Sequence, residues 1–160
     1  MTDTSSVTIR PAERQDVAVI AVMAVEFNAL LAAMDGSEPS LDVAETEAKL
    51  LRAGFGAKPL FSSILAEAKG EAVGYAIYSL GFWADSMAGM VLLTDLFVRE
   101  GWRSRGIGQE IMDRLAEIGR DADCQMLMWT VWTENPAAQR FYERLGARAM
   151  DDERLMMLAI

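Results

Sequence analysis

The sequence predicts a single α/β domain, in which a central mixed β-sheet is flanked by helices. The chain has 160 residues, with 52% apolar and 24% charged residues, which suits one folded domain with a hydrophobic core. Segments with strand-like alternation are interleaved with segments of helical periodicity, which predicts the order β-α-α-β-β-β-α-β-α-β. No repeat or linker composition interrupts this pattern, so we expect residues 1–160 to form one domain.

The first part of the chain is predicted to form one strand and two helices. Residues 7–10 alternate between apolar and polar and form a short strand that ends at Pro11. Apolar residues recur at helical spacing over 12–31. A loop composition at 35–40 separates this helix from a shorter one over 42–51.

The middle of the chain is predicted to be rich in strands. Residues 60–67 and 72–80 form two strands joined by a hairpin turn at 68–71. A second connection follows at 81–89. Residues 90–98 are strongly apolar with one acid, which predicts a central strand.

The last part alternates between helix and strand. Residues 107–119 form an amphipathic helix and residues 126–132 form the next strand. A helix over 137–145 ends at Gly146, and residues 154–160 are predicted as the closing strand.

Composition excludes several classes of function. The chain has no histidine, which removes histidine-based nucleophile systems and histidine general bases. It has one cysteine, Cys124, so no disulfide framework and no metal site are expected, and a cytoplasmic location fits. The net charge of −9 argues against a nucleic-acid partner. No membrane helix or signal peptide is expected.

A glycine-rich turn at 103–109 follows the central strand and opens a helix. Gly106 and Gly108 allow backbone N–H groups to approach a ligand, and the helix N-terminus favours an anion. The same stretch holds three arginines and one opposing acid, namely Arg99, Arg103, Arg105 and Glu100. This combination predicts a site for a phosphate or pyrophosphate.

Two common phosphate motifs do not fit this turn. A nucleoside-triphosphatase loop ends in Gly-Lys-Ser/Thr, whereas Gln109 and Glu110 follow Gly108 here. A dinucleotide-binding fingerprint needs a third glycine, where this chain has Ile111. On the glycine pair alone, an anion site and a purely structural turn both remain open.

Two segments resemble the motifs of the GCN5-related N-acetyltransferase (GNAT) family. Arg-Ser-Arg-Gly-Ile-Gly at 103–108 resembles its R/Q-x-x-G-x-G/A signature, and residues 135–147 resemble its second motif, N-x-x-A-x-x-F-Y-x-x-x-G. The two motifs occur in the family's order with a predicted strand between them. The resemblance extends over nearly the whole chain and implies the acyl-CoA acyltransferase fold of that family.

Further segments resemble the diamine and thialysine acetyltransferase branch of the family, namely 50–59, 73–78 and 93–98. The branch usually has a glutamate where this chain has Thr94, and an aromatic-acid pair where it has Leu30 and Leu31. Both departures remove acids that would hold a cationic substrate.

The resemblance implies acetyl-CoA as cosubstrate. The turn amides with Arg103 or Arg105 would hold the pyrophosphate, and backbone groups of the central strand would pair with the pantetheine arm. Asn135 would bond the same arm and also fits the N-cap of its helix. The implied CoA-binding residues are Leu96, Phe97, Val98, Arg103, Ser104, Arg105, Gly106, Ile107, Gly108, Gln109, Asn135 and Ala138.

The resemblance also implies a catalytic role for Tyr142, as the general acid that protonates the departing thiolate. The alternative is a tyrosine of the core. The general base is open among Glu26, Asp95, a water chain or no base. Three tryptophans, Trp83, Trp129 and Trp132, line the acceptor pocket in one interpretation and belong to the core in the other.

The resulting hypothesis is an N-acetyltransferase that moves an acetyl group from acetyl-CoA to a primary amine of a small molecule, by direct attack in a ternary complex. The competing hypotheses are a non-catalytic CoA-binding module, a protein N-terminal or lysine acetyltransferase, and an acyltransferase with a longer acyl donor. The family resemblance and the apolar residues 156–160 predict a homodimer built through the C-terminal segments.

Overall fold

The computed structural model describes residues 7–160, which divide into two units. The first unit ends at Thr130 and contains all the strands of the described residues. The second unit, residues 131–160, contains one helix, α4 (Pro136–Arg144). The two units are described separately.

The first unit is built on a five-stranded mixed sheet with the order β1-β2-β3-β4-β5. Its strands are β1 (Thr8–Pro11), β2 (Ser62–Ala68), β3 (Glu71–Trp83), β4 (Ala88–Val98) and β5 (Cys124–Met128). Successive strands pair antiparallel except β4 and β5, which are parallel and joined through a helix. The predicted mixed sheet is therefore confirmed.

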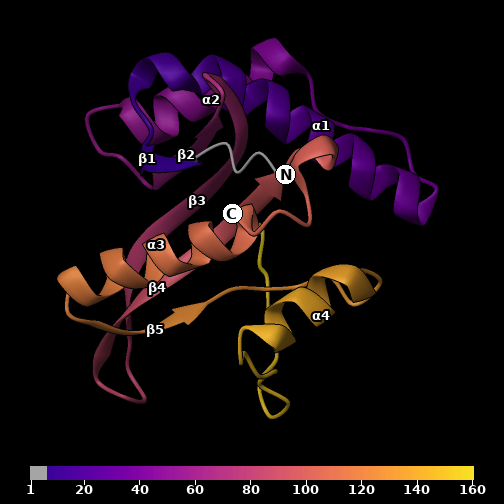
Figure 1. Ribbon diagram of the computed structural model, residues 1–160. Coiled ribbons are helices and arrows are strands. Elements are labelled where there is room, and N and C mark those ends of the chain that lie inside the picture. The colour runs from indigo at the N-terminus through magenta and orange to yellow at the C-terminus, as the bar shows by residue number, and fades with distance from the viewer. Residues whose placement is uncertain (1–6) are drawn as a thin grey trace, which may run out of the picture. The chain divides into compact units, whose positions relative to one another are not determined.

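Three α-helices accompany the sheet within the described residues 7–130. They are α1 (Val17–Asp35), α2 (Val43–Phe55) and α3 (Ile107–Asp121), with short 3₁₀ turns η1 (Arg14–Asp16) and η2 (Glu100–Trp102). α1 and α2 lie together on one side of the sheet, and α3 runs along its other side (Figure 1). α2 begins where the Asp42 side chain accepts from the Glu45 N–H at 2.9 Å, and α1 ends at Gly36 in the left-handed conformation.

Apolar residues from α1 and three strands form a core on one side of the sheet. Ile20 and Met23 pack against Leu65, Tyr75 and Phe97, which come from β2, β3 and β4. This contact buries apolar surface on both partners, which is the main favourable term in folding.

α3 packs closely on the sheet because of a glycine. A Cβ at Gly119 would lie 2.9 Å from Cγ2 of Val91 on β4, so a larger residue would push the helix away from the strand. The apolar face of α3 is buried through Ile107, Ile111 and Leu115. α3 therefore has a fixed distance to β4, the strand that leads into its own N-terminus.

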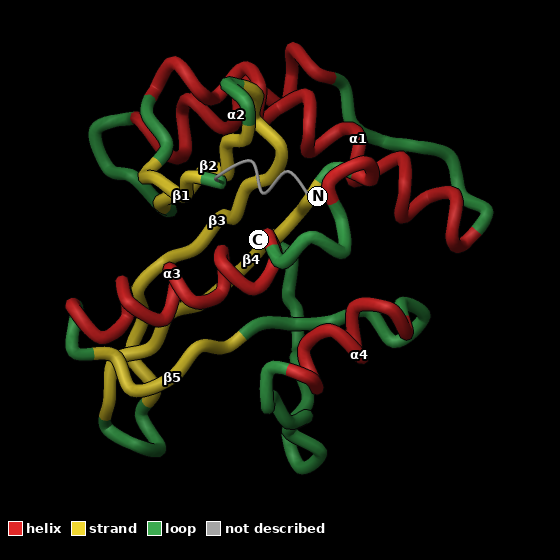
Figure 2. Tube along the Cα trace, in the orientation of Figure 1, coloured by secondary structure: helices red, strands yellow, loops and turns green. Residues whose placement is uncertain are grey.

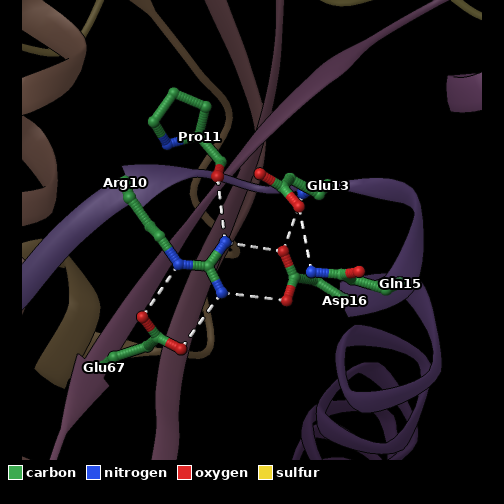
Figure 3. A network of polar contacts seen from close by, with 6 residues as sticks. All are labelled: Arg10, Pro11, Glu13, Gln15, Asp16 and Glu67. Atoms are coloured by element: carbon green, nitrogen blue, oxygen red, sulfur yellow. Dashed lines mark hydrogen bonds and ion pairs between the residues drawn. The ribbon is translucent and has the colours of Figure 1, made fainter. Parts of the chain in front are cut away.

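An ion-pair cluster joins β1, η1 and β2 (Figure 3). The Arg10 guanidinium donates to both oxygens of Asp16, at 2.7 and 2.9 Å, and to both oxygens of Glu67, at 2.8 and 3.0 Å. Asp16 also accepts from the Glu13 N–H at 2.7 Å. The Arg10 guanidinium holds the pKa of both carboxyls below their usual range, mainly through these hydrogen bonds. The cluster fixes the start of α1 against the edge of the sheet.

The sequence predicts no membrane helix, but one helical segment is long and apolar enough to cross a membrane by length and composition. The helical segment Arg14–Asp35 has 22 residues and a mean hydropathy of 2.2. In the first unit this helix packs on the sheet through Val17, Ile20 and Met23, while Val22 is 37% exposed. Apolar residues occur on all sides of this helix, which gives the whole segment its high mean hydropathy.

The connection predicted at 81–89 is largely strand. β3 and β4 stay paired from Leu80 with Val91 to Trp83 with Ala88, so only a short turn joins them. Gly81 and Gly89 suggested a loop, but both lie within the ladder. A Cβ at Gly81 would lie 2.9 Å from Cε of Met90. Glycine at position 81 therefore leaves space for the Met90 side chain and does not mark a turn.

The predicted closing strand at 154–160 is absent from the second unit. Leu155, Met156 and Met157 are 84%, 84% and 94% exposed, and residues 131–160 contain no strand with which this segment pairs. An extended segment needs a pairing partner to become a strand. The preceding strand, predicted at 126–132, is the shorter β5, which ends at Met128.

Candidate functional site

An unpaired edge of β4 is the main feature of the first unit. The β4–β5 ladder runs from Gly89 with Cys124 to Leu92 with Met128 and then stops. β4 continues to Val98, and within residues 7–130 no strand pairs with its 93–98 segment on the β5 side. Figure 2 shows β5 passing into loop while β4 remains strand. Such an edge presents backbone N–H and C=O groups that can pair with an extended ligand.

A β-bulge at Thr94 accompanies the point where the two strands separate. Asp95 pairs with Ile77 and Leu93 pairs with Tyr78, so Thr94 is the extra residue on β4. Its hydroxyl donates to the Ile77 carbonyl at 3.2 Å. A bulge bends its strand and increases the local twist, which accounts for the divergence of β4 from β5.

The unpaired edge leads directly into the glycine turn. Ser104 and Gly106 have φ values of 60° and 86°, and Gly106 caps the N-terminus of α3. A Cβ at Gly106 would meet nothing within 4 Å, so glycine is needed there for its backbone conformation. The first N–H groups of α3 have no acceptor within the helix and lie at its positive end. The turn therefore has the backbone geometry of an anion site.

Two of the three arginines lie along this turn. Arg103 donates from Nε to the Val98 carbonyl at 2.8 Å, and its guanidinium lies 5.5 Å from the Phe97 ring centroid. Arg105 lies 4.9 Å from the Trp102 ring centroid. These contacts hold both guanidinium groups against aromatic rings of the segment 97–105.

Arg99 has a different role from the one predicted. Its guanidinium donates to both oxygens of Glu26 on α1, at 3.0 and 2.8 Å, and to the Ala72 carbonyl at 2.9 Å. The expectation that Arg99 adds charge to the anion site is therefore wrong, because its charge is matched by Glu26. The pairing also engages Glu26, one of the two carboxylates that the sequence offers as a general base.

A pair of ionisable residues, a buried tyrosine and a half-buried aspartate, lies next to the bulge. Tyr75 is fully buried on β3, and its hydroxyl donates to Oδ2 of Asp95 on β4 at 2.5 Å. Burial raises the pKa of Asp95, although the Tyr75 hydrogen bond opposes this shift. Burial and the Asp95 charge also raise the pKa of Tyr75 above its usual range. Sequence reasoning missed Tyr75, since nothing along the chain links it to Asp95, 20 residues away.

In the second unit, the residues of the second motif gather on α4. Asn135 caps the helix, and its side-chain oxygen accepts from the Ala138 N–H at 3.1 Å, with Pro136 in the first turn. The predicted N-cap is confirmed, and the Nδ2 group is the part of the side chain suited to a ligand. Ala138 and Tyr142 are four residues apart and share one face of the helix. The Tyr142 and Phe141 ring centroids lie 5.0 Å apart.

Trp83 lies at the opposite end of β4 from the glycine turn. It pairs with Ala88 at the hairpin turn, whereas the bulge is six residues further along β4. At about 3.3 Å per residue, this separation is roughly 20 Å. The first unit therefore does not bring Trp83 to the bulge.

Comparison with known proteins identifies related sequences. Residues 27–147 match the acetyltransferase (GNAT) family. The human spermidine/spermine N(1)-acetyltransferase-like protein 1 is 34% identical over 137 residues, which are 80% of this chain and 19% of that protein. The thialysine N-epsilon-acetyltransferase of Bos taurus is 31% identical over 122 residues, which are 69% of this chain and 70% of that protein.

Solved structures share the fold. An integron cassette protein from the mobile metagenome of V. cholerae has a TM-score of 0.83 and 25% identity, with 96% of this chain and 93% of that chain covered. The aminoglycoside N-acetyltransferase AAC(6′)-Iy in complex with CoA has a TM-score of 0.77 and 18% identity, with 100% and 98% covered. These likenesses agree with the mixed sheet and its flanking helices.

Proposed function

Because the chain belongs to the acetyltransferase (GNAT) family, we propose that it is an N-acetyltransferase that moves an acetyl group from acetyl-CoA to a primary amine of a small molecule. The observation that carries this proposal is the continuity between the unpaired edge of β4 and the glycine turn at the start of α3. An extended, amide-containing ligand with phosphates at one end fits that combination.

The proposed cosubstrate site follows the chain from β4 into α3. The amides of residues 104–109 hold the pyrophosphate, with charge from Arg103 and Arg105. The backbone of Leu96, Phe97 and Val98 pairs with the pantetheine arm as an additional strand would. This assignment is supported by the ladder that ends at Leu92 and by the left-handed Ser104 and Gly106.

The proposal also assigns roles to residues of α4 in the second unit. Asn135 and Ala138 contact the pantetheine arm, and the Tyr142 hydroxyl donates a proton to the departing sulfur. The shared helix face of Ala138 and Tyr142 supports this assignment. Backbone N–H groups of β4 stabilise the negative charge that develops on the carbonyl oxygen during direct attack by the amine.

We further propose a small diamine or amino-acid-like acceptor, because the relatives named above are called spermidine/spermine and thialysine acetyltransferases. Thr94 at the exposed bulge, where that branch has a glutamate, favours a second candidate, a CoA-binding module without turnover. A protein amine as acceptor, or a longer acyl group on the donor, would make the chain a different kind of acyltransferase within the same family.

Thiol release from acetyl-CoA with a panel of amines tests the proposal. The panel contains a diamine, an amino acid with a side-chain amine, an aminoglycoside and a peptide with a free N-terminus. Release above the rate without amine, with a small-molecule acceptor, supports it. CoA binding by calorimetry without release from any donor and acceptor pair favours the binding module, and release with peptides alone favours a protein acetyltransferase.

The organisation of the molecule belongs to the same proposal. The family match over residues 27–147 crosses the boundary at Thr130, which supports one functional domain.

The exposed apolar side chains of Leu155, Met157 and Leu158 support a homodimer that covers them. The single cysteine and net charge of −9 support a cytoplasmic enzyme of small molecules that does not bind nucleic acid, and we propose no membrane partner.

A further inference from the structure

A cavity lies where β1 ends beside the start of β2. Its volume is about 220 Å³, and it is lined by the end of β1, the end of α2, the start of β2 and Tyr78 of β3. The sheet order places β1 and β2 on the opposite side of β3 from β4. The cavity is therefore separate from the unpaired edge of β4 that is proposed for the cosubstrate.

The walls of the cavity are mostly apolar. Phe55, Phe61 and Tyr78 contribute aromatic side chains, and Pro11 and Pro59 contribute further rings. None of the residues that line the cavity carries a charge. A charged ligand would lose its hydration here without gaining an ion pair. The walls therefore favour a neutral ligand with an apolar body.

The Phe61 wall is positioned by a glycine of α2. A Cβ at Gly54 would lie 2.5 Å from Cζ of the Phe61 ring, closer than two such carbon atoms approach. Glycine therefore allows the ring to lie directly against the backbone of the helix. The chain that returns from α2 to β2 is also held, because the Leu60 N–H donates to the Ala53 carbonyl at 2.7 Å. These contacts fix one side of the cavity.

One polar side chain of the cavity lacks a hydrogen bond. Ser63 is 6% exposed, and its buried Oγ has no partner in the part of the chain that the structure describes. Leu65, two residues along β2, packs on Ile20 and Met23 of α1. Because alternate residues of a strand face the same side of the sheet, Ser63 also faces the helices. The end of α2 borders the cavity on that side.

The Ser63 hydroxyl is suited to bind a group that enters the cavity. A buried hydroxyl without a partner is destabilising, and alanine at this position would avoid that cost. The carbonyl of the same residue already accepts from the Ala12 N–H at 2.9 Å. The hydroxyl can both donate and accept, and it can turn between three staggered positions about χ1. A ligand with one hydrogen-bonding group can therefore supply the missing bond.

We propose that this cavity is a binding site for a neutral aromatic molecule with one hydroxyl group, which forms a hydrogen bond with Ser63. The size fits, because a cavity of about 150 Å³ engineered in another protein holds benzene. The ring of the ligand packs among the side chains of Phe55, Phe61 and Tyr78. The site goes beyond the acetyl transfer proposed above and does not depend on it.

Benzyl alcohol and toluene are matched probes, because they differ in one hydroxyl group. Each is titrated into the full chain, and ¹H–¹⁵N NMR follows the amides of Gly54, Phe55 and Ser63. Benzyl alcohol should give saturable shifts at these amides, with a Kd about two- to tenfold lower than that of toluene, as one added hydrogen bond predicts. Benzylamine, which is protonated at neutral pH, should shift these amides less than benzyl alcohol.

Ser63→Ala removes the hydroxyl and keeps the rest of the cavity. The preference for benzyl alcohol over toluene should disappear, so that their two Kd values differ by less than about twofold. Without a ligand, the free energy of unfolding in urea should not decrease, because the lost hydroxyl had no partner. Ser86→Ala, at an exposed position of the turn between β3 and β4, is the matched control and should keep the preference.

Several results would overturn the site. They are the absence of saturable shifts at the three amides, equal Kd values of the two probes in wild type, and an unchanged preference in Ser63→Ala. An ordered water on Oγ of Ser63 that benzyl alcohol does not displace in a crystal would assign the hydroxyl to hydration. Saturating CoA should leave the Kd of benzyl alcohol unchanged, and competition between them would contradict a separate site. All of these measurements are independent of thiol release, which tests the proposed function.

Discussion

Gly106 has a left-handed backbone conformation, and a side chain at this position would have space around it. Substitutions at Gly106 can therefore test the anion site without a steric clash. Its φ of 86° is accessible to asparagine at modest cost, and a Cβ would contact nothing within 4 Å. Gly106→Asp adds a negative charge beside the proposed pyrophosphate. We expect CoA affinity, measured by calorimetry, to fall by more than tenfold, which is about 1.4 kcal/mol.

Gly106→Asn is the matched control, because it has the same shape as the aspartate without its charge. It should bind CoA more tightly than Gly106→Asp. Equal affinity of wild type, Gly106→Asn and Gly106→Asp would show that the phosphates bind elsewhere.

Tyr142→Phe keeps the ring and its contact with Phe141 but removes the proton proposed for the leaving sulfur. Since the hydroxyl matters only as charge grows on sulfur, we expect kcat to fall about ten- to a hundredfold, toward the low end of acid-base effects. The Kd of acetyl-CoA should be nearly constant. Full kcat in the variant, with chemistry shown to be rate-limiting, would assign Tyr142 to packing.

The role of a residue that bonds to nearby backbone could be predicted from the sequence. The role of a residue whose partner is far along the chain could not. Asn135 was predicted as an N-cap from the Asn-Pro pair, and the structure confirms it. The pairing of Arg99 with Glu26 spans 73 residues, and that of Tyr75 with Asp95 spans 20. Such pairs depend on strand order and helix placement, which spacing along the chain does not contain.

Among the elements, the short strand β1 depends on side-chain anchoring. Arg10 connects it to Asp16 and Glu67 through four hydrogen bonds. Arg10→Met leaves both carboxylates without this partner, and Asp16 is only 10% exposed at its side chain. We expect the free energy of unfolding in urea at neutral pH to decrease by about 1–3 kcal/mol.

The loss of unfolding free energy caused by Arg10→Met should become smaller as the pH decreases. The folded-state pKa values of Asp16 and Glu67 lie below their unfolded values, so their contribution is present above about pH 4 and disappears as pH falls through the folded values. The difference between wild type and Arg10→Met should therefore shrink in acid. Arg114→Met, which breaks a more exposed pair with Glu117, is the control and should cost about 0.3–0.5 kcal/mol. If the difference in unfolding free energy between wild type and Arg10→Met does not change with pH, the ion pairs of Arg10 are not its cause.

Helices and strands could be predicted where the hydrophobic periodicity was strong. The pairing between strands could not. The helix at 107–119 and the strand at 90–98 match α3 and β4 closely. The bulge at Thr94 escaped prediction, because one extra residue is defined only against the partner strand. The segment 154–160 has strand-forming residues but no pairing partner within residues 131–160, so composition alone gave the wrong element.

At the scale of the whole molecule, the exposed apolar residues of the second unit predict an assembly. Leu155 and Leu158 are 84% and 87% exposed. We expect light scattering at micromolar concentration to give twice the 17.6 kDa of one chain. The double variant Leu155→Glu, Leu158→Glu should give a single chain mass, because charges oppose burial of this surface. Wild-type protein with the mass of one chain would contradict the dimer.

The sheet of the first unit lacks a neighbour along the last part of β4, and the proposed cosubstrate arm takes that place. A metabolite would then serve as a structural component, and the resistance of the enzyme to unfolding would follow its concentration. By mass action, a ligand present at a hundred times its Kd adds about 2.7 kcal/mol to the folded state. A cell that depletes its acetyl-CoA would thus lower both the rate of the reaction and the lifetime of the protein that carries it out.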